Sequence, residues 1–261
     1  MRVTCIQLSS GENYNKNFRD IFFYINSALK KKSDLIITPE VSSIITSDIK
    51  KLYDNSYEMK KDPITNKVKD ICRKNKIWIL IGSLPIKVGK KLRNRSILIG
   101  PNGKIVKYYD KINMFDVKIN KKEIYNESKN FQAGNKIVTA NLPWGKIGLT
   151  ICYDLRFPEL FRTLSKKNVK FICVPSAFTK YTGKKHWLTL LKARAIENFC
   201  FIFAPNQIGK NTSNRETYGH SVIISPDGKI LGIKKKNKGL ISVKIDPQES
   251  FRLRKLIPSL S

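Results

Sequence analysis

The sequence WGKIGLTICYDLRFPEL occupies residues 144–160 and predicts a strand, a turn and a helix, in that order. Residues 147–151 are apolar and rich in residue types that favour strands, and this run stops at Cys152. A polar pair follows the cysteine, and a helical pattern begins near Arg156. In open α/β sheets, ligands collect at the carboxyl ends of the strands. The thiol of Cys152 is therefore a candidate nucleophile at such an end.

Two further predicted strands end in charged side chains. Residues 34–38 form a short apolar run that is followed by a proline and then Glu40. Residues 104–109 alternate like a strand and lead to Lys111. A cysteine attacks as the thiolate, so it needs a base to take its proton and a positive charge nearby. The three strand ends together supply a thiol, a carboxylate and an ammonium group.

Strand and helix patterns alternate through both halves of the sequence, which predicts an α/β fold. Residues 112–135 show no clear period and lie between Lys111 and the cysteine strand, where a loop that covers the substrate is expected. The strands after residue 220 are expected to form hairpins. We expect strands at residues 3–8, 34–38, 77–81, 95–99, 104–109, 146–151, 171–174, 200–204, 221–224, 229–233 and 240–245, and helices at 15–31, from about Pro63, at 156–166 and at 185–198.

Length and composition predict a single globular domain. The 261 residues contain no Pro-, Gly- or Ser-rich linker, and residues from about 246 are expected to form a tail helix or extension. The first residues already have a strand pattern rather than that of a signal peptide, and no apolar run approaches the ~20 residues that cross a bilayer. We therefore expect a cytoplasmic protein without a membrane partner.

The net charge of +30 raises the question of a nucleic-acid partner, because 50 Lys and Arg stand against 20 Asp and Glu. The lysines, however, are scattered in ones, twos and threes among many Asn and Ile. The sequence also lacks the alternation of aromatic and basic residues typical of an RNA-binding sheet. We therefore expect a solvated basic surface and no nucleic-acid partner.

Cysteine and histidine usage narrows the chemistry further. The five cysteines form no C-x-x-C pair and are odd in number, so neither a metal site nor a disulfide framework is expected. A base for Cys152 could also be one of the two histidines, as in papain-like proteases. We interpret His186 and His220 as structural, because the sequence around them does not resemble a thiol protease.

Six ordered blocks of this sequence resemble the nitrilase (carbon-nitrogen hydrolase) superfamily, most closely the small amidase branch that contains omega-amidase and deaminated-glutathione amidase. This resemblance implies a single-domain, four-layer α-β-β-α sandwich over residues 1–261, and a homodimer. The blocks are TPE at 38–40, YYDKINMFDV at 108–117, ICYDLRFPEL at 151–160, VPSAFT at 174–179, HWLTLLKARAIEN at 186–198 and YGHSVIISPDGKIL at 218–231.

The resemblance also implies a mechanism that uses no cofactor and no metal. Cys152 would be the nucleophile and Glu40 the base that later acts as an acid. Lys111 and the backbone N–H after Cys152 would stabilise the oxyanion, and Glu127 would position Lys111 and the substrate amide. The reaction would cleave a carboxamide to an acid and ammonia through a thioester on Cys152.

Substrate specificity is expected from Arg156, whose matching arginine binds the substrate carboxylate in the small amidases, together with Tyr153, Phe178 and Thr182. The substrate would be deaminated glutathione or the omega-amide of a 2-oxo acid. Arg156 could instead lie on a helix surface and pair with Glu159 or Asp154. Two rival functions remain: a nitrilase or N-carbamoyl amidase of the same superfamily, or a non-catalytic basic interaction protein on the same fold.

Overall fold

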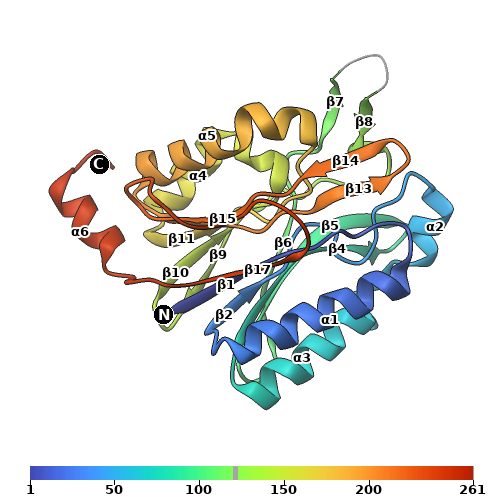
Figure 1. Ribbon diagram of the computed structural model, residues 1–261, viewed down its shortest axis with the longest axis horizontal. Helices are drawn as coiled ribbons and strands as arrows, with labels where there is room; N and C mark the ends of the chain where they lie inside the picture. The colour runs from blue at the N-terminus through green and yellow to red at the C-terminus, as the bar shows by residue number, and fades with distance from the viewer. Residues whose placement is uncertain (120–122, 261) are drawn as a thin grey trace.

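The computed structural model describes residues 1–119 and 123–260, which form a single-domain sandwich of four layers (Figure 1). Two sheets pack face to face in the middle of this sandwich. Helices α1 (Tyr14–Lys30) and α3 (Pro63–Asn75) cover the outer face of the first sheet, and α4 (Pro158–Lys166) and α5 (Lys180–Asn198) cover that of the second. The α-β-β-α architecture expected from the sequence is confirmed.

Along the main path of each sheet, three neighbouring strands are parallel and the strands toward its two ends are antiparallel, while β3, off this path, is parallel to β4. In the first, the order is β17-β1-β2-β4-β5-β6, with β3 paired to β4, and β1, β2 and β4 are parallel. In the second, the order is β16-β15-β12-β11-β10-β9, and β10, β11 and β12 are parallel. The strands are β1 (Arg2–Gln7), β2 (Leu35–Ile37), β3 (Tyr57–Glu58), β4 (Trp78–Val88), β5 (Lys91–Ile99), β6 (Ile105–Asp110), β9 (Val138–Leu142), β10 (Gly145–Leu149), β11 (Val169–Cys173), β12 (Phe201–Ala204), β15 (Ser221–Ile224), β16 (Ile230–Lys234) and β17 (Gly239–Lys244).

Alternation along the strands of the first sheet divides their side chains between two apolar layers. Leu35 and Ile37 of β2 point toward the second sheet, whereas Ile36 between them packs with the helices α1 and α3. Successive side chains of a strand point to opposite faces of the sheet. A strand that is apolar at every position is therefore buried on both faces of the sheet. Ile21 and Ile25 of α1 are completely buried against this outer face, and each such side chain contributes about 1.5–3 kcal/mol.

Several elements differ from the sequence expectations. Residues 240–245 do not pair with the preceding tail strands, because β17 crosses to the first sheet and runs antiparallel to β1. Helix α5 begins five residues earlier than expected. The helix predicted from residue 156 begins at Pro158, because proline favours the first helical turn, and a 3₁₀ helix, η2 (Cys152–Arg156), precedes it.

Two short hairpins were not predicted at all. One is β7 (Asp116–Lys118) with β8 (Ile124–Asn126), inside the stretch interpreted as a loop, of which residues 120–122 lie outside the described part. The other is β13 (Ile208–Thr212) with β14 (Arg215–Tyr218). Both hairpins lie with α2 (Ile49–Asp54) at one end of the sandwich, and the C-terminal helix α6 (Glu249–Leu256) lies at the other (Figure 1).

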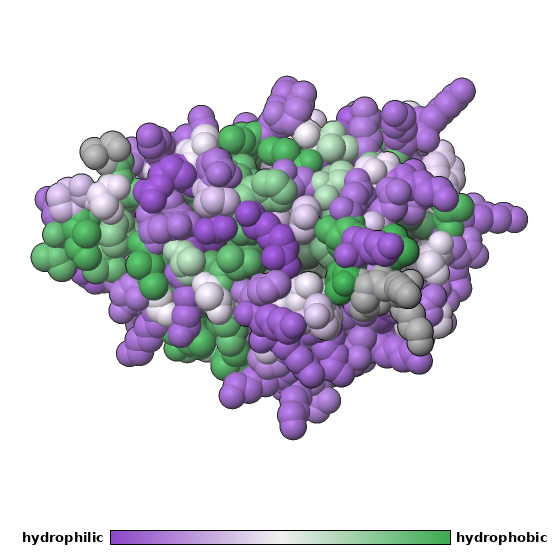
Figure 2. All heavy atoms as spheres, turned by 90° about the horizontal axis from the view of Figure 1, so that it is seen from above, coloured by the Kyte–Doolittle hydropathy of each residue, from purple (hydrophilic) through white to green (hydrophobic). Residues whose placement is uncertain are grey.

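The surface is dominated by hydrophilic side chains. Figure 2, which looks onto the molecule from above, shows them spread over this face, with apolar patches between them. The largest exposed apolar side chains include Phe251, Leu256 and Ile257 of the C-terminal segment. Among the described residues, the helices include none with the length and apolar character needed to span a bilayer.

Gly82 allows the two halves of the sandwich to approach closely beside the turn that carries Glu40. It lies at an irregularity of β4, and its N–H donates to Thr38 Oγ1 at 2.9 Å. A Cβ atom added here would clash with the carbonyl oxygen of Thr38 and lie 2.7 Å from the Cβ of Pro175. Since most of these neighbours are backbone atoms, the site has no room for any side chain.

We expect Gly82→Ala to lower the free energy of unfolding by about 3 kcal/mol, because an overpacked core must displace the backbone. The matched control is Gly100→Ala, whose nearest neighbour would be a side-chain methyl group of Val106 at 3.1 Å, which can shift. Urea unfolding of both variants provides the measurement. Equal midpoints for the two variants would contradict the close approach at Gly82.

Candidate active site

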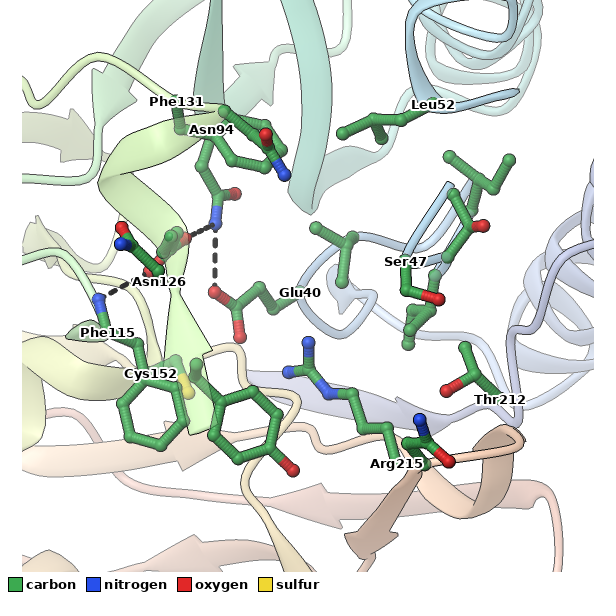
Figure 3. Close-up of a pocket in the computed structure, with 18 of the residues that line it drawn as sticks. Glu40, Ser47, Leu52, Asn94, Phe115, Asn126, Phe131, Cys152, Thr212 and Arg215 are labelled. Carbon is green, nitrogen blue, oxygen red and sulfur yellow. Dashed lines mark hydrogen bonds between the residues drawn. The ribbon is translucent and has the colours of Figure 1, made fainter. Parts of the chain in front are cut away.

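Three segments that are distant in the sequence bring Glu40, Lys111 and Cys152 to the same end of the two sheets. Glu40 follows β2, Lys111 follows β6 and Cys152 follows β10. All three line one cavity of about 330 Å³, and Figure 3 shows Glu40 and Cys152 within it. Their exposed fractions are only 3%, 2% and 7%. The strand ends therefore converge in a shared, largely dehydrated hollow.

The turn that carries Cys152 is held in an unusual backbone conformation. Cys152 has a φ of +49°, and its N–H donates to the carbonyl oxygen of Pro175 at 3.0 Å. Val41, next to Glu40, also has a positive φ of +43°, and its N–H donates to Ser83 Oγ at 2.8 Å. Branched and bulky residues adopt this region only when the surroundings impose it, and such strain concentrates at functional sites.

Lys111 is the centre of a buried ionic cluster. Its Nζ donates to Glu40 Oε1 at 2.9 Å and to Glu127 Oε2 at 2.7 Å. Asn94 of β5 joins the same two carboxylates, because its Nδ2 donates to one oxygen of each at 2.9 Å (Figure 3). The second oxygen of Glu40 accepts from the N–H of Ala177 at 2.8 Å. Each member is therefore fixed by at least two partners.

The electrostatic environment sets the charge of each group at rest. Burial alone would raise the pKa of Glu40, but Lys111, with further help from Arg215 and the Cys152 thiol, holds it below its ordinary value. Burial would lower the pKa of Lys111, but Glu127 and Glu40 raise it. Burial and then Glu40 raise the pKa of Cys152. Around neutral pH the site thus contains a carboxylate, an ammonium group and a neutral thiol.

Asp154 connects the nucleophile turn to the segment around Lys111. Its Oδ2 accepts from the Tyr109 hydroxyl at 2.7 Å and from the N–H of Ile151 at 2.8 Å. Its Oδ1 accepts from the N–H and the side-chain amide of Asn113 at 3.1 and 2.8 Å. Because Asp154 is fully buried, these four bonds fix the spacing between the strand ends of β6 and β10.

The four residues expected to bind substrate lie outside the cavity lining. Arg156 packs over the rings of Tyr153 and Phe178, with centroid distances of 5.9 and 5.3 Å, and its Nη2 lies 3.3 Å from His186 Nδ1. Thr182 Oγ1 forms a hydrogen bond with Thr179 Oγ1 at 2.7 Å. Of these, Tyr153 comes nearest to the cavity, because its ring packs on Phe115, a lining residue.

The structure also bears on the predicted alternatives for Arg156 and for the two histidines. Arg156 forms no ion pair with Glu159 or Asp154, all three being described residues. His220 Nδ1 lies 2.9 Å from the carbonyl oxygen of Tyr218, and neither His220 nor His186 lines the cavity. Within residues 1–119 and 123–260, no cluster of three or more His, Cys, Asp or Glu is placed to hold a metal ion.

Sequence reasoning missed several residues of the site. Asn94 lies just before the strand expected at 95–99 and carried no recognisable signal, since a buried amide has many structural roles. Arg215 was missed because the β13–β14 hairpin itself was not predicted. The apolar part of the lining, which includes Val41, Ile44, Leu52, Phe115 and Phe131, comes from loops and a short helix. These segments meet only in the folded chain.

Comparison with known proteins gives a consistent result. The profile of the carbon-nitrogen hydrolase family matches residues 2–255. Deaminated glutathione amidase from Yersinia enterocolitica is 36% identical over 264 residues, covering 99% of this chain and 91% of that protein. The protein of the same name from Dictyostelium discoideum is 40% identical over 238 residues, covering 88% and 82% of the two chains. The crystal structure of NitFhit from Caenorhabditis elegans superimposes with a TM-score of 0.92 at 32% identity, covering 98% of this chain and 63% of that one. The chain therefore belongs to the carbon-nitrogen hydrolase family and is a hydrolase of carbon–nitrogen bonds in amides.

Proposed function

We propose that the protein cleaves an amide through a thioester on Cys152, with Glu40 as general base and acid and Lys111 as the main stabiliser of the oxyanion. The observation that carries this proposal is the convergence of the three side chains in one buried cavity. The Cys152 thiol is among the neighbours that hold the pKa of the Glu40 carboxyl below its ordinary value, and both groups line the same cavity. Glu40 is therefore the candidate base for the thiol proton.

In the first half of the reaction, Glu40 takes the proton of Cys152 while Sγ attacks the amide carbon. The carbonyl oxygen becomes an oxyanion, which Lys111 and the N–H of Tyr153 would stabilise, because backbone amides in the first turn of a helix have no partner within that helix. When the tetrahedral intermediate collapses, Glu40 returns the proton to the departing amine and the C–N bond breaks. The acyl group remains on Cys152 as a thioester.

In the second half, Glu40 takes a proton from a water molecule, whose oxygen attacks the thioester carbon. Collapse of this second intermediate breaks the C–S bond and returns the proton to Cys152. A free carboxylic acid leaves. The leaving amine is ammonia for a primary amide and a larger amine for a substituted amide.

The electrostatics of the cluster suit this sequence of proton transfers. Burial first, and then the negative charge that a thiolate would place beside the Glu40 carboxylate, raise the pKa of Cys152. The thiol is therefore expected to lose its proton only as the C–S bond forms and disperses the charge. Glu127 would act as a positioning residue, because its carboxylate accepts a hydrogen bond from Lys111 Nζ at 2.7 Å.

We propose a small amide that carries a carboxylate as the substrate, with deaminated glutathione and the omega-amides of 2-oxo acids as the leading candidates. Two relatives with 36% and 40% identity are named deaminated glutathione amidase, which supports this choice. A cavity of about 330 Å³ is within the usual size range for small-molecule sites. Its lining includes a guanidinium group, from Arg215, that can attract an anion.

We expect Cys152→Ala to lower kcat/KM for amine release from 2-oxoglutaramate and deaminated glutathione by at least about 10³-fold, because the nucleophile is lost. Cys72→Ala, which removes another buried thiol from helix α3, is the matched control and should retain activity. Detection of ammonia and of cysteinylglycine provides the measurement. Undiminished amine release by the Cys152 variant would rule out the thioester mechanism.

We also expect the alkylation of Cys152 by iodoacetamide to show no midpoint near the ordinary thiol pKa of ~8.5. Glu40 has a lowered pKa and stays ionised, so it can take the thiol proton during attack throughout about pH 6–9. The rate, measured by mass spectrometry of the peptide that contains Cys152, should then be nearly constant, whereas free cysteine follows its own ionisation. A sigmoidal rise within this range would show that the thiol ionises independently of Glu40.

A further inference from the structure

Arg215 is a cation of the cavity lining that retains unused hydrogen-bond donors. It is the first residue of β14, and its Nη2 donates to the carbonyl oxygen of Ala177 at 3.0 Å. Its Nε is buried and has no hydrogen-bond partner. Within the part of the chain that the structure describes, no carboxylate lies at ion-pair distance from this guanidinium. The guanidinium thus lines the cavity without a carboxylate partner among the described residues, and a ligand carboxylate would supply one.

The Ala177 peptide fixes Arg215 on one side of the base. The N–H of Ala177 donates to Glu40 Oε2 at 2.8 Å, and the carbonyl oxygen of the same residue accepts from Arg215. Lys111 and Asn94 bind the other oxygen, Oε1. Glu40 thus contacts Lys111 and Asn94 through one oxygen and, through the other, the residue whose carbonyl oxygen holds Arg215.

In the proposed reaction, the leaving amine is expected to lie near Arg215. In the proposed reaction the oxyanion forms next to Lys111, and Glu40 passes its proton to the departing amine. The amine is then expected on the side of Glu40 that faces Arg215. Figure 3 shows the Arg215 guanidinium close to Glu40, and Ser47 and Thr212 farther along the cavity lining. The cavity thus continues past Glu40, beyond the space that ammonia would need.

We propose that Arg215 binds a carboxylate on the leaving amine, so that the preferred substrate is an N-substituted amide whose amine part is an amino acid or short peptide. This inference depends on the amide hydrolysis proposed above. A guanidinium presents a planar fork of donors that matches a carboxylate. Arg156 lies outside the cavity lining, so Arg215 is the guanidinium that faces this space.

The test compares three substrates with the same acyl group at about pH 8, where the lowered pKa of Glu40 keeps it ionised. They are 2-oxoglutaramate, deaminated glutathione, and the derivative of deaminated glutathione in which the terminal glycine carboxylate is a carboxamide. For the wild-type protein we expect kcat/KM for deaminated glutathione to exceed that for its carboxamide derivative by about 100-fold, mainly through KM.

Two variants and a control assign this preference to the guanidinium. Arg215→Gln should reduce the ratio of kcat/KM between the carboxylate and carboxamide substrates by about 100-fold, and Arg215→Lys should reduce it less, because the charge remains but the fork is lost. Lys210→Gln in the same hairpin removes an exposed cation outside the cavity lining and should leave the ratio unchanged.

The outcomes separate this inference from the proposed function. Equal wild-type kcat/KM for the two N-substituted substrates would overturn the inference even if the variants fail to fold, while amide hydrolysis would stand. An Arg215→Gln variant that lowers both values by the same factor would also overturn it, because Arg215 would then act only through Glu40. Absence of amine release from all three substrates by the wild-type protein would refute the proposed amide chemistry itself.

Discussion

The burial of the Lys111 ammonium group between two carboxylates is the constraint on which the site depends. A buried cation costs several kcal/mol unless it is paired and hydrogen-bonded. Glu40 and Glu127 supply that pairing at 2.9 and 2.7 Å, and they come from segments on either side of Lys111 in the sequence. The same cluster keeps Glu40 ionised despite its burial and raises the pKa of Lys111. One interaction therefore ties the loops together and sets the protonation states that the chemistry needs.

Around this cluster, buried polar residues and one glycine fix the geometry. Asn94 joins the two carboxylates, and Asp154 joins the nucleophile turn to the end of β6 through four hydrogen bonds. Gly82 leaves space for the backbone at the Glu40 turn. Positive φ angles at Val41 and Cys152 persist because these surroundings hold them. A preorganised cluster of this kind needs little rearrangement when charge develops in a transition state.

The charge of the whole chain and the charge of the cavity have different physical origins. The net charge of +30 comes from side chains that are mostly exposed, and lysine is easily accommodated in water. In the cavity lining, the three carboxylates of Glu40, Glu123 and Glu127 are nearly balanced by one ammonium group and one guanidinium. The net charge therefore reflects the exposed surface, whereas the ion pairs of Lys111 depend on local burial.

The sequence by itself determined the alternation of strands and helices, the four-layer fold class, and the positions of Glu40, Lys111 and Cys152 at strand ends, because period-two and helical patterns and ordered motifs are local properties of the chain. It also indicated Glu127 by its place in a block that resembles the family. It did not reveal the β13–β14 hairpin, the pairing of β17 with β1, or the roles of Asn94, Asp154 and Arg215 around the cavity. Those features depend on contacts between residues that are far apart in the chain, and only the packed tertiary structure decides which distant groups share a buried, low-dielectric space.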